Sequence, residues 1–358
     1  MTGACQDCLR RTWLLERLAG HLDTARGRIG ALLALGDGDL IAAVAGGDGV
    51  AARAGLEAVV GEDVTRALRE AGVEAICRCD ARYPTALRSL GAAAPAVLHV
   101  ADGLERFLEL SAAEPAAIVG ARRASPYALE TARSLARGAG VAGVPVVSGL
   151  ALGVDAAAHQ GALDAGAGTI AVLPCAPERS YPAANRMLHR RILARGACVS
   201  ELGPGISPRR WMFPARNRII AALASVTVVV AARRRSGALV TARWAAELGR
   251  VVGAVPGQVT APLSFGPHEL LRKGAALISG PDDLVAIARP GASPRAPPRL
   301  PPLPSELQAL LDELADGHRP ALAFARAGLG PQAGLAALAE LEMSGRVRRG
   351  VGGGVTVL

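Results

Sequence analysis

From about residue 115, short apolar runs alternate with longer segments of helical periodicity. The apolar runs predict strands at 116–119, 144–147, 169–173, 198–200, 226–230 and 250–255, with a further short strand at 276–278. The segments between them predict helices at 127–138, 156–165, 184–194, 216–223 and 239–248. Apolar strands separated by helices form a parallel sheet that is covered on both faces. We therefore predict an α/β core with a doubly wound, mostly parallel sheet over residues 76–288.

The segments that flank this core have different patterns. Residues 1–75 are rich in Ala and Leu and are broken by glycines near 36–38 and 46–49, which predicts an N-terminal domain of short helices. Such a domain is compatible with a helix-hairpin-helix (SAM-like) module, and equally with an all-α packing domain that binds no ligand. Residues 289–304 are rich in proline, which predicts a semi-rigid linker.

The C-terminal segment, 305–358, has the pattern of a winged-helix-like domain. An amphipathic helix begins at Ser305, two further helical stretches follow, and a Gly-rich hairpin spans 347–357. The third helix is expected at 332–343, and it contains no Lys or Arg. Because a helix that reads the DNA major groove relies on basic side chains, we expect this domain to pack or to bind protein.

Two Ser-Gly turns stand between predicted strands and predicted helices. The first runs from Ser148 and Gly149 to Asp155, and the second is Ser236-Gly237. In doubly wound α/β folds, glycines in such turns let a phosphate approach the free N–H groups at the start of the following helix. The sequence therefore predicts a site for a phosphate-bearing partner at the carboxyl ends of the strands.

Arginines follow the same strand ends. Arg122 and Arg123 come after the first strand, Arg216 and Arg218 flank Asn217, and residues 233–235 are all arginine. Guanidinium groups suit phosphate oxygens and also stack on bases. We expect the pair around Asn217 to contact an anion, whereas the run 233–235 is equally compatible with a solvated loop.

Four other side chains near these turns have two interpretations each. Asp155 and His159 are four residues apart, so they share one helix face. They suit an acid/base pair, but we favour a structural role at the helix start. Tyr181 and Phe213 are expected to be packing rings, with base stacking as the alternative.

Composition and charge favour an anionic partner. The formal net charge is +9 at pH 7 and the pI is about 10.0, which suits nucleic acid. A genome-wide preference for Arg is the alternative source of this excess. Aromatic residues make up only 3% of the chain, which excludes a broad aromatic platform for stacking bases.

The chain contains six cysteines, and its start does not have the pattern of a signal peptide. It also has no apolar run long enough to span a bilayer. We therefore expect a cytoplasmic protein with reduced thiols and no membrane partner. Cys5-x-x-Cys8 and Cys77-x-Cys79 could together form a four-thiolate zinc site, but the second spacing is short for a zinc knuckle. We expect ordinary thiols and no metal.

Several motifs together resemble the DprA/Smf family of DNA-processing proteins. They are the 148–155 turn with Ala158-His159-x-Gly161-Ala162-Leu163, Tyr181-Pro182 with Asn185, Ser200-Glu201, Phe213-Pro-x-Arg-Asn-Arg-Ile-Ile220, Ser236-Gly-x-Leu-x-Thr-Ala242, Pro256-Gly257 and Gly280-Pro-Asp-Asp-Leu284. The resemblance is dense from about residue 80 to 285 and every motif is in the family's order. It is looser at both ends of the chain.

The resemblance implies a Rossmann-like core that binds single-stranded DNA with little sequence preference and protects it. It also implies delivery of that DNA to the RecA recombinase in natural transformation, homodimerisation through the core, no cofactor and no catalytic activity. The DNA contacts that it implies are Arg122, Ser148, Gly149, Phe213, Arg216, Asn217, Arg218, Ser236, Gly237 and Thr241.

The chain departs from the family pattern at several turns, including Pro174-Cys175-Ala176-Pro177 after the third strand. After the fifth strand, Ala231-Ala232 and three arginines replace the family's Glu-Ala, which should strengthen phosphate attraction. The Gly-Asn run after Pro-Gly is replaced by 258–260, and a frequent lysine near Asn185 is missing, with Arg186 as its possible substitute.

Two other classes of function remain as alternatives. One is a nucleotide-binding hydrolase, because the core also resembles nucleoside-monophosphate phosphoribohydrolases. Their catalytic Glu follows a Pro-Gly-Gly-x-Gly-Thr motif, whereas here Ala245 and Ala246 follow the turn and Glu247 is out of register. The missing acid argues against hydrolysis. The other class is an interaction scaffold in which DNA contact is incidental.

Overall fold

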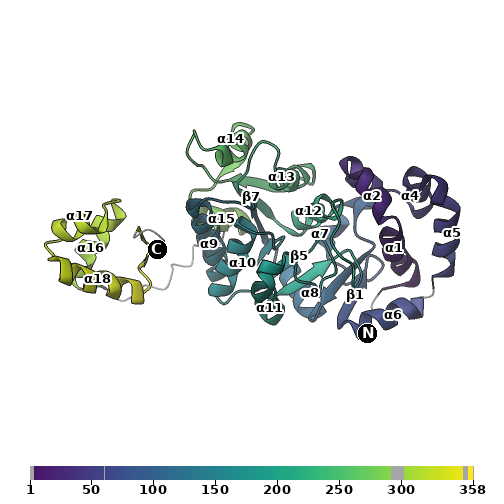
Figure 1. The fold of residues 1–358 in the computed structure, drawn as a ribbon, viewed down its shortest axis with the longest axis horizontal. Coiled ribbons are helices and arrows are strands. Elements are labelled where there is room, and N and C mark those ends of the chain that lie inside the picture. The colour runs from purple at the N-terminus through teal and green to yellow at the C-terminus, as the bar shows by residue number, and fades with distance from the viewer. Residues whose placement is uncertain (1–3, 60, 292–301, 350–353, 358) are drawn as a thin grey trace. The chain divides into compact units, whose positions relative to one another are not determined.

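The computed structural model describes residues 4–59, 61–291, 302–349 and 354–357. The chain divides into two compact units, Met1–Arg295 and Ala296–Leu358, which we describe separately (Figure 1). Most of the linker predicted at 289–304 lies outside the described residues. Within the described parts of the chain, no helix is both long enough and apolar enough to cross a membrane.

A single large sheet forms the centre of the first unit. Its strands, in spatial order, are β1 (Val73–Cys77), β2 (Val97–Ala101), β6 (Ala197–Ser200), β5 (Thr169–Val172), β4 (Val146–Ser148), β3 (Ala116–Gly120), β7 (Val226–Ala231), β8 (Val251–Ala254) and β9 (Ala276–Leu277). All neighbours from β6 to β9 are parallel, whereas β2 is antiparallel to both β1 and β6. The predicted α/β fold with a mostly parallel, Rossmann-like sheet is therefore confirmed.

The strand order reverses direction at one place. From β3 the chain adds β4, β5 and β6 on one side, and then returns to add β7, β8 and β9 on the other side of β3. Loops that leave the carboxyl ends of β3 and β7 therefore diverge. In open α/β sheets this divergence creates the crevice in which ligands bind.

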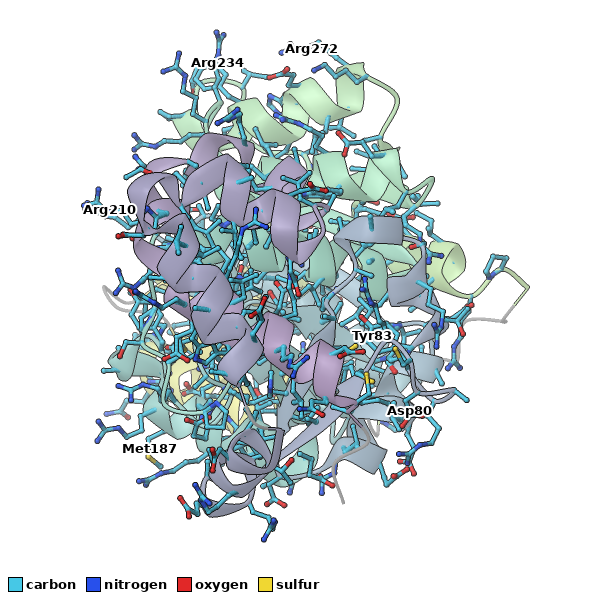
Figure 2. The ribbon with its side chains drawn as sticks, turned by 90° about the vertical axis from the view of Figure 1, so that its right-hand side faces the viewer. Asp80, Tyr83, Met187, Arg210, Arg234 and Arg272 are labelled. Atoms are coloured by element: carbon cyan, nitrogen blue, oxygen red, sulfur yellow. The ribbon has the colours of Figure 1, made fainter. Side chains whose placement is uncertain are left out.

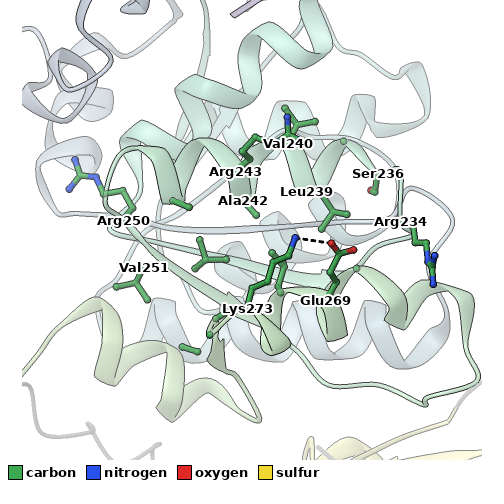
Figure 3. Close-up of a pocket in the computed structure, with 18 of the residues that line it drawn as sticks. Arg234, Ser236, Leu239, Val240, Ala242, Arg243, Arg250, Val251, Glu269 and Lys273 are labelled. Atoms are coloured by element: carbon green, nitrogen blue, oxygen red, sulfur yellow. Dashed lines mark hydrogen bonds and ion pairs between the residues drawn. The ribbon is translucent and has the colours of Figure 1, made fainter. Parts of the chain in front are cut away.

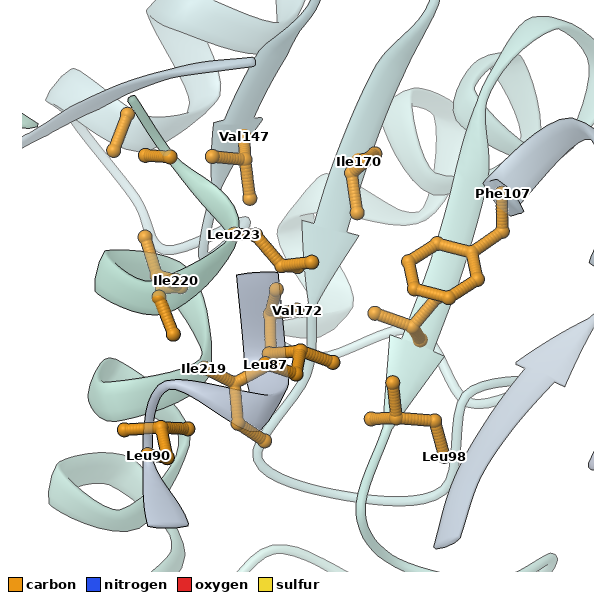
Figure 4. Close-up of a cluster of buried hydrophobic side chains, with 14 of the residues drawn as sticks. Leu87, Leu90, Leu98, Phe107, Val147, Ile170, Val172, Ile219, Ile220 and Leu223 are labelled. Atoms are coloured by element: carbon orange, nitrogen blue, oxygen red, sulfur yellow. The ribbon is translucent and has the colours of Figure 1, made fainter. Parts of the chain in front are cut away.

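Alternate residues of each strand face two different helical layers. On one side, Val146 and Ile118 pack with α9 (Pro126–Val141), α10 (Val154–Asp164) and α15 (Pro281–Ala288). On the other side, Val147 and Ile170 pack with α12 (Met212–Leu223), α13 (Gly237–Glu247), α7 (Thr85–Arg88) and α8 (Leu104–Ala112) (Figure 4). Because both faces are covered, the central strands are apolar throughout, as their sequences indicated.

The core helices start earlier than the sequence predicted in some cases. Helix α12 begins at Met212 rather than at 216, because Pro214 falls in the first turn, where proline is tolerated. Helix α11 (Arg186–Arg195) begins after Asn185, slightly later than the predicted range 184–194. Helix α14 (Phe265–Arg272), between β8 and β9, was not predicted.

The N-terminal helices share a core with the sheet domain. They are α1 (Gln6–Arg17), α2 (Ala19–Thr24), α3 (Ile29–Leu33), α4 (Asp37–Val44), α5 (Gly49–Ala58) and α6 (Gly61–Glu70). Their leucines surround the fully buried Trp211 and Met212 at the start of α12. The backbone N–H of Trp211 donates to Asp23 at 2.9 Å. The predicted boundary near residue 75 therefore falls inside one compact unit.

Strands β1 and β2 were not predicted. An ionisable residue interrupts the apolar run of each strand, Glu74 in β1 and His99 in β2, which weakens the signal that the sequence prediction depends on. They pair along their full length and extend the sheet beyond β6.

The second unit has the elements that the sequence indicated. Three helices, α16 (Ser305–Ala315), α17 (Pro320–Arg326) and α18 (Pro331–Met343), precede the antiparallel pair β10 (Val347–Arg349) and β11 (Val355–Val357). Leu310, Phe324 and Leu341 are buried at their centre. Helix α18 carries no Lys or Arg. The winged-helix assignment stays a prediction.

Candidate nucleic-acid interface

A cleft of about 360 Å³ opens at the point where the strand order reverses. Its walls come from the end of β3, the turn after β4, the first turns of α12, and the loop between β7 and α13. Seven of the predicted DNA contacts line it: Arg122, Phe213, Arg216, Asn217, Ser236, Gly237 and Thr241. The sheet topology thus gathers residues from segments more than a hundred positions apart.

Ser148 and Gly149 do not line the cleft. The Ser148 side chain is fully buried, and its hydroxyl donates to the carbonyl of Ile118 at 2.7 Å, which ties β4 to β3. The carbonyl of Gly149 accepts a hydrogen bond from Arg216. A Cβ atom at Gly149 would overlap that guanidinium. Both residues are therefore buried parts of the turn and present no exposed surface to a phosphate.

Arg218 also lies outside the cleft. Its side chain is 1% exposed, and its guanidinium donates to Glu201 at 2.6 Å, to the carbonyl of Ala93 at 2.8 Å and to that of Ala215 at 2.7 Å. Positions two apart on a helix point to nearly opposite sides. Since α12 begins at Met212, Arg216 and Arg218 both belong to the helix body, and only Arg216 reaches the cleft. The expected anion contact at Arg218 is replaced by a buried ion pair.

Arg216 forms the floor of the cleft. It is buried, and its guanidinium donates to the carbonyl of Gly149 and, at 2.6 Å, to that of Val172. The buried Asp155 carboxylate lies 3.9 Å away. Burial raises the pKa of Asp155, and the positive charge of Arg216 opposes that rise. One side chain therefore joins the turns after β4 and β5 to the start of α10.

Arg122 stands exposed at the rim. Its guanidinium lies 5.0 Å from the centre of the Phe213 ring, in cation–π contact. Phe213 in turn meets Tyr181 edge to face, with ring centres 5.6 Å apart. Gly153, at φ 83°, packs so closely under the carbonyls of Ala121 and Arg122 that a Cβ would collide with them. Contacts with Gly153 and with the Phe213 ring therefore hold the loop that carries Arg122 in place.

The first turn of α13 forms another wall of the cleft. The Ser236 hydroxyl caps the helix by accepting from the N–H of Ala238 at 3.4 Å. The amide of Asn217 donates to the carbonyl of Gly237 at 3.2 Å, so α12 holds α13 in place. Thr241 is buried one turn further along. The start of a helix carries unpaired N–H groups and a partial positive charge, and here it faces the cleft.

His159 has no free nitrogen for chemistry. The ring is fully buried, with Nδ1 2.8 Å from the Thr169 hydroxyl and Nε2 3.3 Å from the backbone N–H of Leu150. Thr169 donates its own proton to the carbonyl of Val146, so Nδ1–H donates to Thr169 and Nε2 accepts from Leu150. Burial, with a contribution from Arg216, lowers the pKa of His159 to about 3. The ring therefore supports Leu150, whose φ is 54°, as a structural residue.

Two further hollows adjoin the cleft and extend its positive surface. One, of about 480 Å³, is lined by Arg122, Arg123, Arg233 and Arg235. The other, of about 1040 Å³, lies between α13 and α14 and includes Arg234, Arg243, Arg250 and Lys273 (Figure 3). Both share Arg235 and Ser236 with the cleft. Figure 2 shows Arg234 and Arg272 projecting outward from this part of the molecule.

Residues 74–289 match the family model described as DNA recombination-mediator protein A. The chain belongs to this family. A DNA processing protein DprA of Mycobacterium tuberculosis is 42% identical over 254 residues, which are 66% of this chain and 63% of the relative. The DNA processing protein DprA of Streptococcus pneumoniae is 42% identical over 170 residues, 48% of this chain and 60% of the relative. This chain therefore spans less than two thirds of the length of these relatives.

Solved structures agree with this assignment. The chain superposes on DNA processing protein A from Streptococcus pneumoniae with a TM-score of 0.61 and 32% identity, over 70% of this chain and 85% of that one. A structure of DNA processing protein A from Helicobacter pylori, whose subject is its single-stranded DNA binding mode, gives a TM-score of 0.53 and 30% identity over 60% of this chain and 94% of that one. None of these descriptions names a catalytic activity.

The cleft also lacks the acid that the hydrolase alternative requires. Among the described residues that line it, Asp155 is the only carboxylate, and it is buried beside Arg216. Glu247 stands at the end of α13 and is exposed, away from the cleft.

Replacing Arg218 tests its buried role. Arg218→Ala should lower the free energy of unfolding by about 3–5 kcal/mol, because it leaves Glu201 buried without its partner. Arg122→Ala, on the exposed rim, should change it by less than about 0.5 kcal/mol. Urea unfolding of both variants measures the difference. Equal small losses would show that Arg218 is not a structural residue.

The protonation of His159 can be followed directly. Its imidazole should stay neutral from pH 8 to about pH 4.5 in an NMR titration, because the folded pKa is about 3 against about 6.5 in the unfolded chain. The unfolded chain then binds more protons between these values, so stability should fall with acidification by up to about 1.4 kcal/mol per pH unit below pH 6.5. A midpoint near 6.5 in the folded chain would contradict this structural role.

Proposed function

We propose that this chain binds single-stranded DNA with little sequence preference, across the cleft between β3 and β7. The observation that carries the proposal is the convergence of exposed arginines and a helix start on one cleft at the reversal of strand order. Family membership and the Helicobacter pylori relative support it.

Phosphate groups account for most of the proposed affinity. Arg122, Arg123, Arg233 and Arg235 are exposed around one hollow next to the cleft, and Arg235 lines both. A strand that follows these side chains releases counterions as its phosphates are neutralised. The run 233–235 therefore acts as a phosphate-binding loop in this proposal, in preference to the solvated loop that the sequence left open.

The start of α13 supplies a second kind of anion contact. Ser236 already satisfies the N–H of Ala238. Gly237 lines the cleft, and its N–H is one of those at a helix start that have no partner within the helix. Helix starts of this kind bind phosphate through backbone N–H groups and the helix dipole. Gly237 has no side chain that would keep a phosphate at a distance.

Base contacts are few in this arrangement. Phe213 is half-buried and is already in contact with Arg122 and Tyr181, so one ring and one guanidinium plane are offered to a base. Binding that depends on the backbone and on one or two stacked bases has little sequence preference. In this proposal the cleft, of about 360 Å³, holds an unpaired nucleotide in preference to a base-paired duplex.

The wider biological role is also part of the proposal. By its similarity to the family, we propose that the chain forms a homodimer, protects the bound strand and delivers it to the RecA recombinase, in the cytoplasm and without a cofactor or a reaction of its own. This would serve natural transformation or general recombination. The C-terminal unit, whose helix α18 has no basic residue, is proposed to contact protein.

Removing two rim arginines should weaken DNA binding without unfolding the protein. Arg122→Ala/Arg235→Ala should lower affinity for a fluorescent oligothymidine by on the order of tenfold or more at low salt, and reduce the slope of log K against log salt by about 1.4, since each phosphate contact contributes about 0.7. Fluorescence anisotropy at several salt concentrations measures both quantities.

A matched control is Arg53→Ala/Arg190→Ala. It makes the same charge change at two exposed arginines, on α5 and α11, that do not line the cleft or its neighbouring hollows. Equal losses in the two double variants would mean that only net charge matters, and would contradict the proposed site. Release of free base from nucleoside monophosphates by the wild type would instead favour the hydrolase alternative.

A further inference from the structure

Two pairs of cysteines from distant parts of the chain meet at the edge of the sheet. The sulfur atoms of Cys5, Cys8, Cys77 and Cys79 all lie within 4.8 Å of one another. The sulfurs of Cys8 and Cys79 are 3.7 Å apart. The sequence left this cluster as an open alternative to ordinary thiols, and the fold brings all four together.

These distances match a tetrahedral metal site. Zinc bound by four thiolates has Zn–S bonds of about 2.3 Å, which places neighbouring sulfurs about 3.8 Å apart. The Cys8–Cys79 separation is already close to this value, and no other sulfur–sulfur separation in the cluster exceeds it by more than about 1 Å. Small side-chain rotations would bring the four sulfurs to the ideal geometry.

The backbone explains why the unusual spacing works. Cys5 is the residue before the first turn of α1, and Cys8 lies in that turn, so their sulfurs are on one side of the helix start. Cys77 is the last residue of β1. Arg78 and Cys79 are the central residues of a turn, which the N–H of Asp80 closes by donating to the carbonyl of Cys77 at 2.9 Å. The chain therefore bends directly after Cys77, and the sulfur of Cys79 stays within 4.8 Å of that of Cys77. A Cys-x-Cys pair at a strand end and in the turn after it thus takes the place of the usual Cys-x-x-Cys turn.

The surroundings also suit a metal centre. Cys8 and Cys77 are buried against Leu68 and Val97, while Cys5 and Cys79 are exposed and leave a path for the ion. The backbone N–H of Cys5 donates to the sulfur of Cys77 at 3.4 Å. Hydrogen bonds of this kind orient a ligand and stabilise its negative charge. Figure 2 views this side of the chain, with Asp80, the residue after Cys79, labelled.

We propose that Cys5, Cys8, Cys77 and Cys79 bind one zinc ion. Four protein thiolates fill the coordination shell, so the site is structural and leaves no position for a substrate. The ion would join the start of α1 to the end of the edge strand β1, two segments about seventy residues apart. It would therefore fasten the N-terminal helices to the sheet.

The first test is the metal content of the full chain, purified with a reductant and without chelator. Inductively coupled plasma mass spectrometry should find about one zinc per chain. The double variant Cys5→Ser/Cys79→Ser should lose it, and because both sulfurs are exposed, the apolar core stays intact. Cys175→Ala, at a buried cysteine outside the cluster, is the matched control and should retain the zinc.

Cobalt gives a geometric test. Adding Co²⁺ to the reduced, metal-free wild type should produce intense visible bands of tetrahedral coordination and a near-ultraviolet sulfur-to-cobalt band. Zinc should then remove both. The double variant should show neither.

Removing the metal should also lower the thermal unfolding midpoint of the wild type, and a chelator should leave the midpoint of the double variant unchanged. The proposal is overturned if the reduced wild type carries no zinc and gives no cobalt spectrum, if it binds iron in preference to added zinc, or if the four thiols are found joined in disulfides.

Discussion

The buried guanidinium of Arg216 is the contact on which the cleft depends. It joins the carbonyls of Gly149 and Val172, which end two neighbouring strands, and it lies beside Asp155 at the start of α10. A buried cation of this kind is stable only where several acceptors surround it, so the turns have to take one arrangement. That arrangement leaves the cleft open between the ends of β3 and β7.

Several buried contacts near Arg216 also hold these turns in one arrangement. Ser148 ties β4 to β3, His159 supports Leu150 in its left-handed conformation, and Gly153 lets the loop of Arg122 rest directly on the turn. The residues that the sequence indicated as phosphate contacts are therefore divided between two roles. Ser148, Gly149, Arg216 and Arg218 make buried contacts that hold the turns in place, whereas Arg122 and Arg235 are exposed and are the side chains that we propose contact DNA.

The strands of the parallel part and the place of the site could be predicted from sequence because they depend on short-range patterns. Apolar runs identified each strand of the parallel part, and polar turns identified the carboxyl ends. The direction of individual side chains could not be predicted. Arg216 and Arg218 look equivalent until the start of α12 is known, because a shift of a few residues rotates both around the helix. The antiparallel strands β1 and β2 were missed because an ionisable residue, Glu74 or His99, interrupts each short apolar run.

The cysteine cluster illustrates the same limit. Its ligands come from a helix start and a strand end, and only the pairing of β1 with β2 and the packing of α1 against them bring the sulfurs together. The two cysteine pairs are visible in the sequence as separate motifs, but the approach of one pair to the other depends on this long-range packing. It also shows that the N-terminal helices are part of the same folded unit as the sheet.

Hydrogen–deuterium exchange with and without a short single-stranded oligonucleotide tests the central claim most directly. We predict slower exchange in the segments 120–124, 149–154 and 233–239, which surround the cleft, and no change in α16 to α18. Protection confined to the N-terminal helices or to the C-terminal unit, with these three segments unchanged, would contradict a DNA site between β3 and β7.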